Sequence, residues 1–301
     1  MWIDDLNAVE LLPRSRQYEA LRNLRAAAAA GGHEQWNTAF DPASLYEAWT
    51  RLPLARGVYE FNHPVIRDAI RDRAQWSIVE VGGGNGALWQ DFFAGSQAGT
   101  LTLIDPNESA HEAVAARLPD HVGFRSIVGQ VEAADIPACD VLVSSLTLHH
   151  VAGRDAEQRA TFGLAGDGKT EILDRFLTAI RMRDGVGILN EADCYNEIDL
   201  APGDPALVDS FIDAYVRRTA RAVADALAHQ DDAAESARAW QLILRHWCLD
   251  EVDHAFLPRA DRDVYELDVA SWLDLLTRVG ARNVGHTYTD QWNLFVQYVF
   301  H

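Results

Sequence analysis

The residues most able to do chemistry in this sequence surround a glycine-rich turn that follows a short apolar run. Residues 76–81 form the apolar run, and the glycines after it are Gly82, Gly83, Gly84 and Gly86. Glycine lets the backbone turn sharply and approach a ligand closely, because no Cβ intervenes. A second apolar run, residues 101–104, ends in Asp105, 19 residues after the last of these glycines. A carboxylate at this place can accept both hydroxyl hydrogens of a ribose, so the pattern predicts a nucleoside-cofactor site.

The carboxylate of Glu80 helps to separate two cofactors that such a site could hold. The spacing of Gly82, Gly84 and Ala87 also satisfies a dinucleotide fingerprint. Glu80 stands two residues before the first glycine, where its charge would repel the pyrophosphate of NAD. S-adenosylmethionine carries no phosphate and presents cationic sulfonium and ammonium groups instead. We therefore expect S-adenosylmethionine, and an NAD-type oxidoreductase is kept as the weaker alternative.

Residues 79–86 (VEVGGGNG) resemble the first motif of the class I S-adenosylmethionine-dependent methyltransferases of small molecules, and Asp105 matches that family's ribose-binding acid. Further matches follow in the family's order. Residues 138–151 resemble the fourth strand and its loop, residues 185–191 the fifth strand, and residues 272–281 the helix before the sixth.

The resemblance covers about residues 76–191 and 268–301. It implies an α/β fold with a Rossmann-like, seven-stranded, mostly parallel sheet. Two adjoining runs at 282–289 and 292–300 suit the antiparallel hairpin that closes this sheet.

The resemblance also implies which residues surround the cofactor. They are Glu80, Gly82, Gly83, Gly84, Gly86, Asp105, Pro106, Gln130, Val131, Ser144 and Ser145. Gln130 departs from the family, which usually has an acid facing the adenine amino group. An amide oxygen can accept the same hydrogen bond.

Hydrophobic periodicity predicts alternating strands and helices, which is typical of a parallel sheet covered on both faces. The expected strands lie near residues 76–81, 100–104, 123–128, 139–145 and 185–191, and the expected helices near residues 17–30, 42–52, 64–73, 87–94, 108–117 and 170–182. We expect residues 1–70 to form a helical N-terminal lid segment and residues 71–301 to form the core. A helical insert at 195–265 would complete the lid over the acceptor.

The expected catalytic residues follow the fourth and fifth strands. Methyl transfer from a sulfonium depends chiefly on in-line positioning, and a base is needed only where the acceptor atom starts protonated. His149, His150, Glu191 and Asp193 are the candidates. Glu191 and Asp193 stand two residues apart, so on a continuing strand they would share one side and form an acidic mouth for a polar acceptor that is methylated on nitrogen or oxygen.

The histidines and acids of the insert do not have the spacing of a metal site. His246, Asp253 and His254 form no HxH or HxxxH pair on one helical face, so no metal is expected. A C-methyltransferase, metal-assisted or not, is kept as an alternative, and so is a cofactor-binding protein without catalytic activity.

Composition excludes several classes of partner. A formal charge of −19 and a pI near 4.8 oppose binding to nucleic acid. Three widely separated cysteines suggest neither a disulfide framework nor a zinc site, which fits a reducing cytoplasm. No secretion signal or membrane-spanning run is present, so we expect a cytoplasmic enzyme with a small-molecule substrate. A homodimer is left open.

Overall fold

The computed structural model describes residues 53–151, 167–193 and 266–301, together with isolated positions before residue 51. The helices expected at 17–30 and 42–52 and those of the insert at 195–265 lie outside these ranges, apart from the isolated positions. Everything below concerns the described residues.

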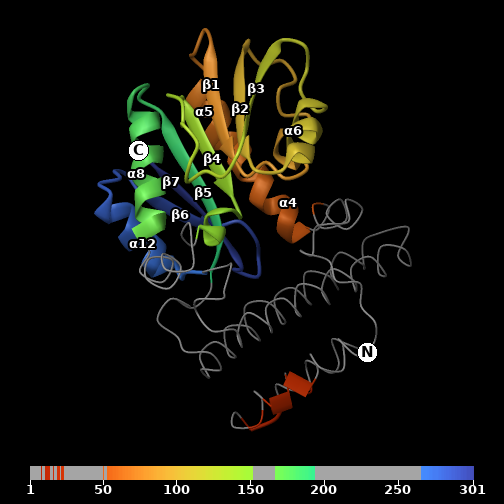
Figure 1. Ribbon diagram of the computed structural model, residues 1–301, viewed down its shortest axis with the longest axis vertical. Coiled ribbons are helices and arrows are strands. Elements are labelled where there is room, and N and C mark those ends of the chain that lie inside the picture. The colour runs from red at the N-terminus through yellow and green to blue at the C-terminus, as the bar shows by residue number, and fades with distance from the viewer. Residues whose placement is uncertain are drawn as a thin grey trace, which may run out of the picture.

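The core is one seven-stranded sheet with the strand order β3-β2-β1-β4-β5-β7-β6 (Figure 1). Its strands are β1 Trp76–Val81, β2 Gly99–Asp105, β3 Val122–Val128, β4 Val141–Ser145, β5 Val186–Ala192, β6 Gly285–Tyr288 and β7 Phe295–Phe300. The first five strands are parallel, and β7 runs antiparallel between β5 and β6. This is the class I methyltransferase arrangement, so the predicted fold is confirmed.

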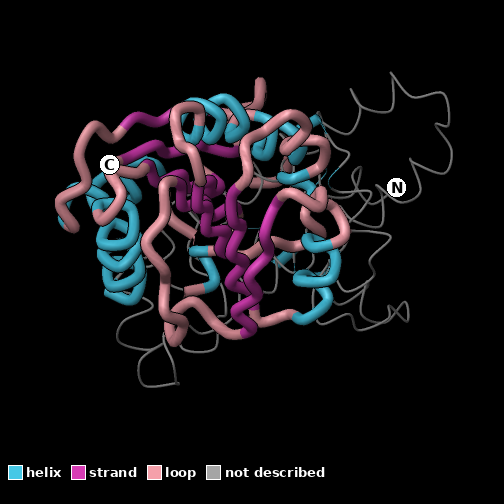
Figure 2. The backbone as a smooth tube through the Cα atoms, turned by 90° about the horizontal axis from the view of Figure 1, so that it is seen from above, coloured by secondary structure: helices cyan, strands magenta, loops and turns pink. Residues whose placement is uncertain are grey.

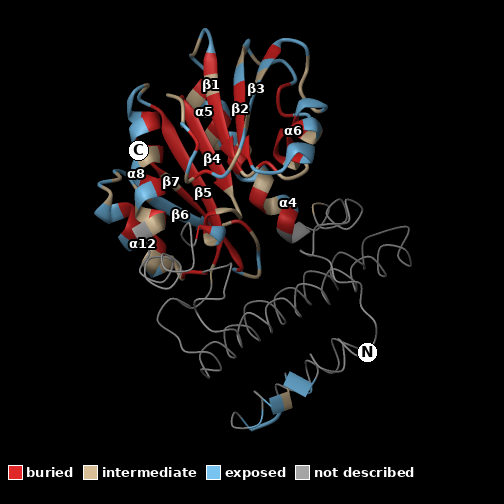
Figure 3. Cartoon of the chain, in the orientation of Figure 1, coloured by how far each residue is buried: buried red, intermediate tan, exposed pale blue. Residues whose placement is uncertain are grey.

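Helices cover both faces of the sheet, as the view from above shows (Figure 2). On one face, α5 Asn62–Ile70 and α6 Glu108–Ala115 share a buried core with β1 and β2. On the other face, α8 Asp167–Arg181 and α12 Val269–Arg278 pack over β4, β5 and β7. Because both faces are covered, the central strands β1, β4 and β5 are mostly apolar and almost wholly buried (Figure 3).

Short polar side chains fix where two of these helices begin. The side chain of Asn107 accepts a hydrogen bond from the Ser109 backbone at the start of α6, and Asp268 accepts one from Ser271 at the start of α12. Such N-caps satisfy backbone donors that have no partner within the helix. A further helix, α4 Pro53–Glu60, precedes α5. None of the described helices is long and apolar enough to cross a bilayer.

The helix predicted at residues 87–94 is wrong. Only a 3-10 turn, η1 Ala87–Trp89, forms there, and Asp91 then adopts a left-handed backbone with φ 57°. His63 contacts the carbonyl oxygen of Leu88 at 2.7 Å, so this carbonyl is engaged by α5 instead of continuing a helix. The aromatic side chains of this stretch pack against Trp76 and one another, and tertiary packing overrides the helical pattern.

The terminal hairpin forms as predicted, with a longer connection than expected. Its strands β6 and β7 are separated by residues 289–294, whereas the sequence suggested a break at 290–291. The carboxylate of Asp290 accepts hydrogen bonds from the backbones of Trp292, Leu294 and Phe295, which closes this turn.

Candidate active site

The carboxyl ends of β1, β2, β4 and β5 meet at one edge of the sheet, the lower edge in Figure 1. Ligands of open α/β sheets bind at this edge, near the point where the strand order reverses. Here the reversal lies between β1 and β4, which pair directly in parallel. The glycine loop follows β1 at this point.

Asp105 and the glycine loop are brought together as the sequence suggested. The Asp105 carboxylate accepts a hydrogen bond from the backbone N–H of Gly83 at 3.0 Å and another from Asn107 at 2.8 Å. Each of its oxygens retains a lone pair, and the residue is 8% exposed. Both carboxylate oxygens can therefore still accept a hydrogen bond, which fits the two hydroxyl donors of a ribose.

The loop after β4 packs directly on the glycine loop. Gly82 has φ +75°, and a Cβ built there would lie 2.0 Å from Oγ1 of Thr147. The Thr147 hydroxyl lies within hydrogen-bond distance of the carbonyl oxygens of Ser145, at 3.0 Å, and of Val81, at 3.3 Å. Only glycine allows this approach, and the approach brings the residues after Thr147 beside the glycine loop.

Glu80 is buried beneath the glycine loop and not exposed at its mouth. Its Oε2 accepts a hydrogen bond from Nε1 of Trp89 at 2.6 Å. Burial raises the pKa of Glu80 to about 8, and the Trp89 hydrogen bond only partly opposes this effect. In the protein alone Glu80 is therefore largely protonated near neutral pH.

The remaining predicted cofactor residues lie at the same edge of the sheet. Pro106 and Gln130 are exposed, Val131 is buried, and the Gly129 backbone donates to the carbonyl oxygen of Asp105. These positions place the loop after β3 beside Asp105. Each residue stays a prediction as a cofactor contact.

The two serines that end β4 differ in their partners. The buried hydroxyl of Ser144 has no hydrogen-bond partner among the described residues. Ser145 accepts a hydrogen bond from the side chain of Asn190 at 2.9 Å. Asn62 of α5, which sequence reasoning missed, accepts from both Asn190 and Gln297, so a buried amide network ties this helix to the strand ends.

A second cluster lies where the loop after β4 meets the end of β5. The loop contains a 3-10 turn, η2 Leu148–His150. Glu191 is completely buried, and its Oε1 accepts hydrogen bonds from the backbones of Leu148 at 2.8 Å and Thr147 at 3.3 Å. Its Oε2 lies 2.7 Å from Nδ1 of His149. Two predicted catalytic residues, His149 and Glu191, are thus in direct contact.

A third member of this cluster, Glu266, was missed by sequence reasoning. Glu266 is 4% exposed, and its Oε1 lies 4.0 Å from Nδ1 of His149. It stands just before α12, after the insert, and no motif distinguishes it in the sequence. We call His149, Glu191 and Glu266 the buried triad.

Opposing effects act on the Glu191 carboxyl. Burial, the largest, raises the pKa of Glu191 to about 7. The hydrogen bond from Leu148 and the charges of Lys169 and His150 act in the opposite direction, because they favour the ionised form. Glu191 therefore titrates near neutral pH, in contact with an imidazole.

The other two predicted catalytic residues are placed differently. His150 is exposed, with its ring centroid 4.2 Å from that of His149. Asp193 follows the end of β5 and accepts hydrogen bonds from the Tyr288 hydroxyl at 2.6 Å and the Val269 backbone at 3.3 Å. These partners tie the start of α12 to the terminal hairpin, whereas Glu191 is engaged by η2.

The buried triad has one geometric feature of a metal site. One ligand atom from each of its three residues lies within 4.8 Å of the others. The separation of 2.7 Å between His149 and Glu191 is that of a hydrogen bond, however, and Oε1 of Glu191 already accepts two backbone donors. We interpret the arrangement as a hydrogen-bonded acid and base cluster.

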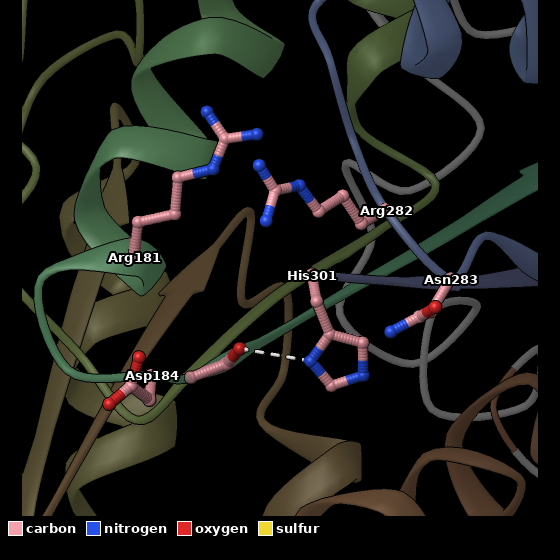
Figure 4. Close-up of a pocket in the computed structure, with 6 residues that line it drawn as sticks. Arg181, Asp184, Arg282, Asn283 and His301 are labelled. Carbon is pink, nitrogen blue, oxygen red and sulfur yellow. Dashed lines mark hydrogen bonds between the residues drawn. The ribbon is translucent and has the colours of Figure 1, made fainter.

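A cavity of about 500 Å³ lies at the opposite edge of the sheet, where β5 begins and β7 ends (Figure 4). It is lined by Arg181, Asp184, Gly185, Arg282, Asn283 and His301. None of these is a predicted site residue, and amino ends of parallel strands are not where such sheets bind their cofactors.

No protein-family model matches the sequence, and no curated protein matches it. Solved structures that resemble the chain include the S-adenosylmethionine-dependent methyltransferase SibL, with 17% identity and a TM-score of 0.44 over 80% of this chain. A protein of Nostoc punctiforme PCC 73102 described as a candidate O-methyltransferase has 15% identity and a TM-score of 0.45 over 99% of this chain and 71% of its own length.

Human N-acetylserotonin methyltransferase, solved with S-adenosylmethionine, has 13% identity and a TM-score of 0.44 over 97% of this chain and 71% of its own length. The chain spans only 54% of SibL. Many of the similar solved structures are thus S-adenosylmethionine-dependent methyltransferases, and what they share with this chain is the fold.

Proposed function

We propose that this chain transfers a methyl group from S-adenosylmethionine to a hydroxyl oxygen of a small-molecule acceptor, with His149 as the general base. The observation that supports this most is the buried triad, which holds an imidazole on the same loop after β4 that packs on the glycine loop. A positioned base suits an acceptor atom that begins with a proton.

Asp105 and the glycine loop are the residues that would hold the cofactor. S-adenosylmethionine, when bound, supplies a methyl group on a positively charged sulfur that leaves as a neutral thioether. The protein then needs to align the acceptor and to remove its proton.

His149 is suited to remove that proton. In the tautomer that this role requires, Nδ1–H of His149 donates to Glu191, 2.7 Å away, and Nε2 is the basic nitrogen. As the new oxygen–carbon bond forms and the carbon–sulfur bond breaks, the acceptor proton passes to Nε2. The carboxylates of Glu191 and Glu266 stabilise the resulting imidazolium, so both act as positioning residues.

Calorimetry with S-adenosylhomocysteine and with NAD tests the cofactor. We expect binding of the first and none of the second. Tight NAD binding without a response to S-adenosylhomocysteine would exclude the methyltransferase assignment.

Transfer of a labelled methyl group to a panel of phenols, alcohols, amines and carbon acids tests the acceptor. We expect labelled ethers. His149→Gln should lower kcat about 100-fold or more, well beyond the effect of His150→Gln, and His286→Gln on the exposed face of β6 is the control. Labelling of amines or carbon acids alone, or full activity of His149→Gln, would overturn the proposed role of His149.

A further inference from the structure

The chain contains a single lysine, and that lysine is buried. Of the 26 lysines and arginines in the sequence, Lys169 is the only lysine. It lies in the first turn of α8 and is 1% exposed. A buried ammonium is costly unless nearby groups compensate its charge, so its surroundings should contain negative partners.

Those surroundings include the end of the loop that carries His149. The Nζ of Lys169 donates a hydrogen bond to the carbonyl oxygen of Val151 at 3.0 Å, and Val151 directly follows η2, which carries His149. The charge of Lys169 also reaches Glu191, whose pKa it lowers. Lys169 is therefore anchored to the loop that carries the imidazole, and its charge acts on the carboxylate that contacts the imidazole.

The triad places two buried carboxylates beside one imidazole. Glu191 from β5 and Glu266 from the segment before α12 both lie within ion-pair range of His149. Two buried carboxylates would hold a proton tightly, either on one of themselves or on the imidazole. An imidazole that is already protonated cannot act as a base.

We propose that Lys169 is a positioning residue whose fixed positive charge balances one triad carboxylate, so that His149 is neutral and able to accept a proton near neutral pH. The inference rests on the proposed function, because it assigns His149 the role of base. Of the other described groups near Glu191, His150 on η2 adds positive charge when protonated, while Asp193 adds negative charge and Tyr298 of β7 is a neutral phenol.

Lysine suits this role better than arginine. An ammonium is a compact charge, and Lys169 can donate to the carbonyl oxygen of Val151 while its field acts on the Glu191 carboxylate. A guanidinium presents five donors in a fixed plane and needs more acceptors. Lysine is used only at this buried position, and all the other lysine or arginine positions of the chain are arginine.

Lys169→Met tests the proposal, because it removes the charge and keeps the length of the side chain. NMR of histidine-labelled protein, with His149 assigned through His149→Gln, reports imidazole protonation without any need for turnover. We expect His149 in Lys169→Met to protonate about one pH unit higher than in the wild type. Lys169→Arg, which keeps the charge, should stay closer to the wild type.

The pH dependence of kcat/KM gives a second readout. A variant that has only lost packing around residue 169 would not reproduce it. We expect kcat/KM of Lys169→Met to fall about tenfold at pH 7 and to recover to within about twofold at pH 9, because the base is regained when the proton is removed. A loss that is equal at both pH values, or an unshifted His149 titration in a folded variant, would overturn the role of Lys169.

The single lysine also allows a test in the unmodified protein. Labelled lysine gives one side-chain resonance, which should shift as the triad titrates near pH 7 and should lose this shift in Glu191→Gln. A resonance indifferent to pH between 5 and 9 would overturn the proposal even if Lys169→Met does not fold. Absence of methyl transfer in the wild type would instead contradict the proposed function, and the NMR result would still stand.

Discussion

Nδ1 of His149 lies 2.7 Å from Oε2 of Glu191, and this contact joins the loop after β4 to the end of β5. The same carboxylate holds the loop through the backbone of Leu148, so one buried side chain both shapes η2 and orients its imidazole. Because Glu191 both shapes this loop and orients the imidazole, it determines where His149 can accept a proton.

We expect Glu191→Gln to lower kcat about 100-fold, with little change in the affinity for S-adenosylhomocysteine. The amide cannot stabilise an imidazolium as a carboxylate does, while the cofactor contacts are made by other residues. Single-turnover kinetics and calorimetry provide the two measurements. Asp274→Asn on the exposed surface of α12 is the matched control.

Comparison of Glu191→Gln with Asp193→Asn distinguishes a role of the buried triad from a role of the acidic mouth, formed by Glu191 and Asp193, that the sequence predicted. Asp193 is engaged by Tyr288 and Val269, so we expect its amide variant to lose stability more than turnover. An equal loss of kcat in both variants would instead favour a shared acidic mouth.

Activity should fall as the pH is lowered through about 7. Burial raises the pKa of Glu191 to about 7, and a protonated Glu191–His149 pair has no base to offer. The pH dependence of kcat/KM measures this acid limb. Full activity retained down to pH 5 would show that proton removal by this pair does not limit the reaction.

Asp105→Ala should weaken binding of S-adenosylmethionine by about 1.5–3 kcal/mol, the usual scale for hydrogen bonds to a charged group. The variant also loses the contact between Asp105 and the Gly83 backbone, so thermal unfolding must accompany the calorimetry. Unchanged affinity in a folded variant would mean that the ribose is held elsewhere.

The buried Glu80 should make the unliganded protein less stable as the pH rises from about 5 to 8. The folded protein holds this proton up to a pKa of about 8, whereas the unfolded chain releases it near the ordinary glutamate pKa of 4.5. Between these values folding takes up a proton, so the free energy of unfolding decreases by up to about 1.4 kcal/mol per pH unit.

Urea unfolding of the wild type and of Glu80→Gln at pH 5.5 and 8 measures this effect. The amide still accepts the Trp89 hydrogen bond and carries no charge, so the variant should lose part of the pH dependence and be the more stable protein at pH 8. Glu191 contributes a similar effect up to about pH 7 and remains in both proteins. Identical pH dependence in the two proteins would contradict the assigned state of Glu80.

Removal of divalent metal should leave methyl transfer intact, because the triad is interpreted as an acid and base cluster. Activity after dialysis against a chelator measures this directly. If activity is lost on dialysis and returns when a divalent cation is added, the buried triad would be a metal site and the metal-assisted alternative would be favoured.

The sequence by itself determined the fold and the region of the cofactor site. Strand 76–81, the glycines after it and Asp105 form local sequence patterns. Such patterns can be recognised from residues that are close along the chain, because an apolar run favours a buried strand and glycines allow the tight turn after it. Their order and the resemblance that it carries predicted a mostly parallel sheet with a closing hairpin, which the structure confirmed. Local pattern failed at residues 87–94, where contacts with α5 and Trp76 outweigh helix propensity.

Only the tertiary structure decided how the acidic and basic side chains combine. His149 and Glu191 are 42 residues apart in sequence, and Glu266 follows a long insert, so no periodicity relates them. Their convergence depends on β4 and β5 pairing in parallel and on α12 packing over that pair. Burial then raises the pKa of Glu80 and of Glu191, since the cost of a charge depends on the three-dimensional surroundings that desolvate or compensate it.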